Sequence, residues 1–226
     1  MTTAEGWTAA VRDLLAPGRL LPLGSAGDRA WITEHAARQV LDPAATAVRG
    51  LVPGELRFEA APAAGDGGRA APAPPGALAP GPLRISTGFG VVMGDRPLPE
   101  LAEELRTALL TAAREGLGLP VTTVDLEVTE LLDAAPAEVG PAAPLPGRPS
   151  PAAEDATTLA VLRVEGVAGV TDAWGPPVHR GPDGVRVELA VTSGHRPLDV
   201  ARAVRKTVAA AAGKATAVTV LVSELR

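Results

Sequence analysis

The sequence predicts an α+β fold of two related small domains, each with helices packed on a small mixed sheet. Residues 83–131 and residues 185–225 carry the same succession of apolar patterns, about a hundred residues apart. Both stretches pass through the turn motif Gly-x-Arg-Pro-Leu, at 94–98 and at 194–198, and then into an amphipathic helix. A Pro- and Ala-rich segment lies between them. We therefore expect a duplicated unit with the order helix, strand, strand, helix, strand.

The first unit is expected over residues 31–133. Thr33 can cap its first helix, and Pro43 is expected to break or kink that helix. Gly116 and Gly118 are expected to end its second helix, which begins near Pro97. In chain order we expect a helix over 36–48, strands over 55–60 and 85–91, a helix over 97–116 and a strand over 121–128.

The second, shorter unit is expected over residues 154–226. The sequence Pro182-Asp183-Gly184 is a strong turn signal between its first two strands. In chain order we first expect, over 155–164, a short helix or a helix that merges into a strand. A strand over 170–178 around Trp174, a strand over 185–191, a helix over 200–211 and a strand over 218–222 should follow.

Three segments lie outside these units. Residues 1–30 are expected to form a helical extension. Residues 61–82, almost entirely Ala, Pro and Gly, are expected to form an elongated hairpin loop inside the first unit. Residues 134–153, with six prolines, are expected to form a semi-rigid linker between the units.

Composition excludes several classes of function. A net charge of −5 over 226 residues disfavours a nucleic-acid binder. The absence of cysteine excludes disulfides and thiolate metal sites and fits a reducing compartment. No stretch has the length and apolarity of a membrane span or a signal peptide, so we expect a cytoplasmic protein without direct membrane insertion. The excess of arginine over lysine is typical of a high-GC bacterial genome.

The repeated residues build the fold and carry no recognisable catalytic group. Ile85 and Phe89 of one unit match Val185 and Leu189 of the other, whereas His195 stands where the first unit has Asp95. No two of the three histidines have metal-ligand spacing. The glycine-rich pieces lack the context of a phosphate-binding loop, and those at 88 and 90 indicate a bulge or a close backbone approach. The sequence predicts a non-enzymatic protein without cofactor or metal.

The candidate contact residues are arginines that recur at matched positions, together with one tryptophan. Arg96 and Arg196 recur in the turn motif, and Arg106 and Arg205 recur one turn inside the following helix. They are interpreted either as guanidiniums that contact a partner or as solvated groups at a helix start. Trp7 lies on a short amphipathic segment and either packs in the core or docks on a partner. Trp31 and Trp174 are expected to be anchors of the same kind.

Several short motifs together resemble the alkaline-shock-protein family of bacterial envelope stress proteins. They are the Gly-x-Arg-Pro-Leu turn, the stretches Val48-Arg49-Gly50-Leu51 and Val164-Glu165-Gly166-Val167 after the first helices, and strands ending in Val-x-Glu-Leu at 128–131 and 222–225. The resemblance covers residues 31–132 well and 156–226 less completely. It implies a non-enzymatic cytosolic scaffold that is associated with the membrane through an anchor protein or assembles with itself, and that acts in envelope homeostasis.

An alternative function rests on residues 164–170. Their sequence, Val-Glu-Gly-Val-Ala-Gly-Val, is similar to the first strand and turn of ferredoxin-like ligand-binding domains. The alternative is therefore a tandem small-molecule-binding regulatory module. A thermal shift with a metabolite would favour it over the scaffold.

Overall fold

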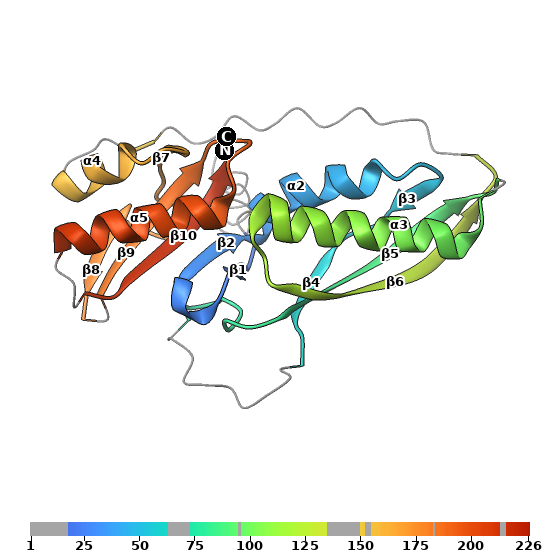
Figure 1. The fold of residues 1–226 in the computed structure, drawn as a ribbon, viewed down its shortest axis with the longest axis horizontal. Coiled ribbons are helices and arrows are strands. Elements are labelled where there is room, and N and C mark those ends of the chain that lie inside the picture. Colours follow the sequence, from blue (N-terminus) through green and yellow to red (C-terminus); the bar gives the residue numbers. More distant parts are fainter. Residues whose placement is uncertain are drawn as a thin grey trace, which may run out of the picture.

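A computed structural model describes residues 18–62, 73–94, 96–134, 150–151, 155–182, 184–212 and 216–226. The chain has an α+β fold, as expected, with two mixed sheets that each carry helices (Figure 1). The large sheet has six strands in the order β1-β2-β10-β9-β7, with β8 also paired to β9. The small sheet has four strands, in which β3, β4 and β6 all pair with β5.

The elements follow three successive stretches of the chain. The first holds β1 (Leu20–Leu23), a short 3-10 helix (Ala26–Asp28) and β2 (Ala30–Thr33). The second holds α2 (Glu34–Thr46), β3 (Leu51–Pro53), β4 (Arg57–Ala60), β5 (Leu83–Val92), α3 (Leu98–Thr111), a π-helical turn (Ala112–Leu117) and β6 (Val121–Leu132). The third holds α4 (Ala156–Leu162), β7 (Val167–Val170), β8 (Val178–Gly181), β9 (Gly184–Val191), α5 (Pro197–Ala212) and β10 (Val218–Leu225).

The second and third stretches share one order of elements and one pairing pattern. In each, two short strands pair antiparallel with a long strand, and a helix then leads to a final strand parallel to that long strand. The long strands bury alternate apolar residues, such as Ile85 and Phe89 in β5 and Val187 and Leu189 in β9, against the helices. Each half therefore has three strands before its second helix, one more than the sequence predicted.

The hairpin of β1 and β2 joins the two halves. Strand β2 pairs parallel with β10, with Trp31 opposite Leu221, and β1 pairs antiparallel with β2. Thr33 adds a hydrogen bond from its hydroxyl to the carbonyl oxygen of Ser223, 2.8 Å away. Residues 31–33, with which the first unit was expected to begin, thus form a strand in the sheet of the second unit. The described part of residues 1–30, expected to be helical, contains the strand β1.

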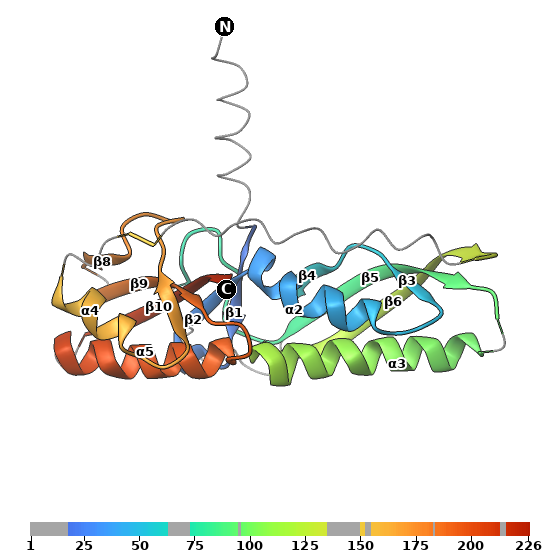
Figure 2. The same cartoon turned by 90° about the horizontal axis from the view of Figure 1, so that it is seen from above.

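The two halves share one hydrophobic core. A single cluster of buried side chains runs from Leu21 and Ile32 through Phe58 and Leu105 to Val204. Helices α3 and α5 lie end to end along one side of the molecule (Figures 1 and 2). The negative end of the α3 dipole therefore meets the positive end of the α5 dipole, which is favourable.

Several local expectations are confirmed and two are wrong. Thr33 caps α2, with its side chain accepting from the Ala36 amide, and Gly118 ends the α3 segment with a φ of 86°. Pro43 does not end α2, which continues to Thr46 because Leu41 and Ala45 bury its inner face. Residues 170–178 are not one strand, because Trp174 lies in the loop between β7 and β8.

The proline-rich loop expected over 61–82 does connect two antiparallel strands, β4 and β5. Its described part also reaches the large sheet, where the Leu78 amide donates to the Leu20 carbonyl and the Trp31 indole donates to the Leu78 carbonyl. Most of the expected linker, residues 134–153, lies outside the described residues. In the part of the chain that the structure describes, no helix has both the length and the apolarity needed to cross a bilayer.

Candidate functional site

The four predicted contact arginines all have partners within the chain. Arg96 pairs with Glu104, and Arg106 pairs with Glu103, both at the surface of α3. Arg196 donates to the carbonyl oxygen of Arg114 at 2.7 Å, and Arg205 donates to the carbonyl oxygen of Gly27. The matched pairs therefore have different roles. Arg96 and Arg106 also donate to the carbonyl oxygens of Arg49 and Val124, so they tie α3 to the rest of its own half, whereas Arg196 and Arg205 tie the second half to the first.

The four arginines do not share one surface. Arg96 precedes the start of α3, while Arg196 contacts the turn that follows its end. The length of the α3 segment, about 30 Å for twenty helical residues, separates the two turn motifs. The repeated Arg-Pro-Leu motif therefore does not place the four arginines on one common basic surface.

The tryptophans lie on the large sheet where they are described. Trp31 is buried with Leu20 and Leu221 on the face away from α5, and Trp174 packs against this cluster. Both are core anchors, one of the two interpretations given above. Trp7 lies outside the described residues.

The small sheet has an unpaired edge. Strand β6 pairs with β5 on one side, and no strand of the described residues pairs with its other side. The matching strand of the large sheet, β10, has β2 on that side. Strand β6 is twelve residues long, and its second half is exposed, with Val128 at 39% and Leu131 at 67%. Long apolar edges of this kind are sites where another chain can add a strand.

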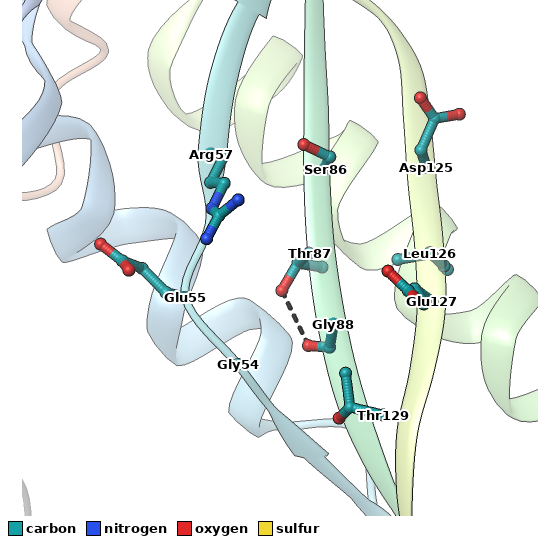
Figure 3. Close-up of a pocket in the computed structure, with 10 residues that line it drawn as sticks. All are labelled: Gly54, Glu55, Arg57, Ser86, Thr87, Gly88, Asp125, Leu126, Glu127 and Thr129. Atoms are coloured by element: carbon teal, nitrogen blue, oxygen red, sulfur yellow. Dashed lines mark hydrogen bonds between the residues drawn. The ribbon is translucent and has the colours of Figure 1, made fainter.

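A shallow hollow of about 420 Å³ lies beside this edge, on the face of the small sheet opposite α2 and α3. Figure 3 shows it between β4, β5 and β6, with Arg57 on one wall and Asp125, Glu127 and Thr129 on the other. Gly88 forms the floor, and a Cβ there would lie 2.5 Å from the Thr129 methyl group. The bulge expected at these glycines is confirmed, since the pairing of β5 with β6 shifts in register between Phe89 and Gly90. At Gly88 the close neighbour is the Thr129 side chain, which a larger residue would displace.

The rim of the hollow and the β6 edge are acidic. Asp125, Glu127 and Glu130 are all exposed on the same face of β6. One of them is partly neutralised, since Arg84 lies 3.3 Å from the Asp125 carboxylate. Arg57 lines the opposite wall and has no ion pair among the described residues. The surface therefore offers strand hydrogen-bonding groups, apolar side chains and excess negative charge together.

The matching place on the large sheet is filled. Glu188 stands where β5 has Gly88, and its fully buried carboxylate accepts from the Thr171 hydroxyl and from the amides of Ala173 and Trp174, at 2.8–2.9 Å. These bonds hold the loop 171–177 on the sheet. Burial raises the pKa of Glu188, and the hydrogen bonds and Arg186 oppose this rise.

A second carboxylate, Asp28, holds the β1–β2 hairpin to α5. It accepts from Arg202 at 2.8 Å and 3.1 Å and from both the amide and the hydroxyl of Ser25. The hydrogen bond from Arg202 lowers the pKa of Asp28 to about 2. The carboxylates of Glu188 and Asp28 are therefore both held by several hydrogen bonds that stabilise loops and hairpins of the fold.

The described residues contain no group of three His, Asp or Glu side chains placed to bind a metal ion. The sequence reasoning missed the β6 edge because a free edge depends on which distant strand pairs with it. One signal was available, since the matching strands β5 and β9 carry Gly88 and Glu188 at the same position. The glycine leaves the outer face of the small sheet without a side chain there, whereas the glutamate binds a loop over the large sheet.

Comparison with known proteins gave no family. A scan against protein-family models, a search of curated proteins and a search of solved structures each found no match.

Proposed function

We propose that the chain is a non-enzymatic protein-interaction scaffold that binds an extended segment of a partner along the β6 edge. The observation that carries this proposal is the free edge of the twelve-residue strand β6, which pairs with β5 on its other side and is exposed at residues 127–131. Its counterpart β10 binds a strand in parallel through Ala30, Trp31 and Ile32. The same backbone geometry therefore accepts an added strand once within this chain.

Charge indicates the kind of partner. Pairing β6 with β6 of a second copy would bring two sets of Asp125, Glu127 and Glu130 together, and like charges opposite one another across strands are destabilising. A partner segment that alternates apolar residues with lysine or arginine would match the exposed Val128 and Leu131 as well as the carboxylates. We favour such a heterologous partner over self-association.

The resemblance to the alkaline-shock-protein family supports a cellular location for this scaffold, next to the membrane. In that family the cytosolic protein is held at the membrane by a separate anchor protein, and its role is in envelope stress. We propose the same arrangement here, with the anchor protein supplying the basic segment.

The test uses edge variants and a matched surface control. The full chain and the variant Val128→Lys/Leu131→Lys are immobilised and incubated with a detergent-solubilised envelope fraction of a bacterium that carries the gene. The control is Leu159→Lys/Leu162→Lys on α4, where both leucines are also exposed, at 47% and 38%. We expect a membrane protein that is retained by the wild type and the control, lost by the edge variant, and released by salt. Equal retention by all three proteins would refute the role of the β6 edge.

A further inference from the structure

A second cavity lies on the large sheet. It has a volume of about 260 Å³ and is formed by β8, β9, β10 and the residue before β2, with residues 73–75 of the proline-rich loop along its side. Its charged and polar lining is Arg29, His179, Arg186 and Thr219. Its described lining residues include no acidic side chain. Asp183, in the turn between the lining residues Pro182 and Gly184, lies outside the described residues.

Strand register places these four side chains in one row. His179 of β8 lies opposite Arg186 of β9, which lies opposite Thr219 of β10. The next pair along is Val220 with Ala30, so Arg29 stands beside Thr219. Neighbouring strands lie about 4.8 Å apart, so the row spans about 14 Å on one face.

The guanidiniums in this row have hydrogen-bonding capacity left. The Nε atoms of Arg29 and Arg186 are both buried and have no hydrogen-bond partner within the described part of the chain. Arg29 forms no ion pair with the described residues, and Arg186 donates one Nη2 hydrogen to the Trp174 carbonyl, 3.1 Å away. Glu188, two residues along β9, is already occupied by Thr171, Ala173 and Trp174. Among the described residues, the row therefore has no carboxylate as a dedicated counterion.

The backbone at Arg29 is also unusual. Its φ is 48° and its ψ 43°, and it is the one residue other than glycine with positive φ in the described ranges. Glycine or asparagine would adopt this conformation at lower free energy. An arginine that is held there against its backbone preference fits a role for its side chain in the cavity.

We propose that this cavity, formed by Arg29, His179, Arg186 and Thr219, binds the phosphate group of a small phosphate monoester. Each of the four side chains can donate a hydrogen bond, and two of them are permanent cations. A phosphate monoester offers three acceptor oxygens and up to two negative charges, which suits this set better than a single carboxylate. The volume lies just below the range of drug-sized pockets, so the ligand is a small metabolite rather than a dinucleotide. This site is independent of the β6 edge and of the scaffold role.

The test is isothermal titration calorimetry of the full chain with glycerol 3-phosphate, with inorganic phosphate and with glycerol, at constant ionic strength. We expect saturable binding of both phosphates and none of glycerol. Arg29→Asn and Arg186→Gln should each weaken binding at least about tenfold, as expected for loss of a charge-assisted hydrogen bond. Arg163→Gln, which removes an exposed arginine that does not line the cavity, should leave the affinity unchanged.

Three outcomes would overturn the proposal. The first is the absence of saturable binding up to about 10 mM phosphate monoester, and the second is an unchanged affinity in Arg29→Asn. The Arg29→Asn variant tests the proposal even if Arg186→Gln fails to fold, because asparagine tolerates the left-handed conformation at this position. The third is retention of the protein by phosphatidic acid vesicles through Arg29 without competition from glycerol 3-phosphate, which would assign the site to a lipid surface instead.

Discussion

Gly118→Ala should destabilise the protein through the junction between the two halves. Gly118 ends the α3 segment with a φ of 86°, and a Cβ there would lie 2.4 Å from the Cβ of Leu198 in α5. The contact is with a Cβ rather than a flexible side-chain end, so the backbone of one half must move. Alanine in the left-handed region costs about 1–2 kcal/mol, and overpacking a filled site adds about 1–3 kcal/mol.

Gly194→Ala separates these two contributions. Gly194 has a φ of 88°, nearly the same as Gly118, but a Cβ at Gly194 would meet nothing within 4 Å. Its substitution should therefore lower the free energy of unfolding only by the backbone contribution. The difference between the two variants, about 1–3 kcal/mol, measures the packing of Leu198 on Gly118.

The assay is equilibrium urea unfolding followed by circular dichroism, together with thermal melts of both variants. For a chain of this length, 1 kcal/mol corresponds to about 2–4 °C in Tm, so Gly118→Ala should melt about 2–12 °C below Gly194→Ala. If the two variants have the same Tm, α3 and α5 do not abut as described, and the shared core of the two halves would be refuted at this junction.

Three further variants test individual interactions. Asp28→Asn should lower the free energy of unfolding by about 2 kcal/mol at pH 7. Because the pKa of Asp28 is lowered from 3.8 to about 2, this contribution is present above pH 4 and disappears as the pH falls to 2. Urea unfolding across pH 2–7 would contradict it if the difference in stability between wild type and variant stayed constant. Glu188→Gln should lower the free energy of unfolding by about 1–3 kcal/mol, because one backbone donor in the loop at Trp174 loses its acceptor. Amide hydrogen exchange in that loop should also become faster. Glu165→Gln, at the surface, should change neither the stability nor the exchange. Pro43→Ala should raise stability by about 2 kcal/mol, since alanine restores an amide donor inside α2, and an unchanged Tm would show that the helix is already interrupted there.

Local patterns predicted the parts of the fold whose partners are close in sequence. The alternation in residues 85–91 and 185–191, followed by amphipathic helices and Val-rich strands, predicted β5–α3–β6 and β9–α5–β10 almost residue by residue. These crossovers form because a strand, its helix and the next strand bury one another within about fifty residues. The cap at Thr33 and the end at Gly118 were predictable for the same reason.

The pairing of β2 with β10 was not predictable in this way. Residues 30–33 show only that a short apolar strand exists, while its partner lies almost two hundred residues away. The loop at Trp174 escaped prediction because its conformation is set by the buried carboxylate of Glu188, whose partners are backbone amides that any residue could supply. Arg29 and Arg186 of the proposed phosphate cavity were not predictable either, because they become neighbours only through the pairing of β2 and β9 with β10.

The differences between the matched halves decide which surfaces remain available. Gly88 leaves the small sheet hollow, whereas Glu188 binds a loop over the large one. Strand β10 is covered by β2, whereas β6 is not covered by any described strand. If the β6 edge were only an unprotected flank, lysine at its exposed positions would improve solubility and change nothing else. If it binds a basic segment, the same lysines must abolish that binding while the α4 control retains it. The edge variants therefore distinguish an unprotected strand edge from a surface to which another protein adds a strand, as β2 adds to β10 within this chain.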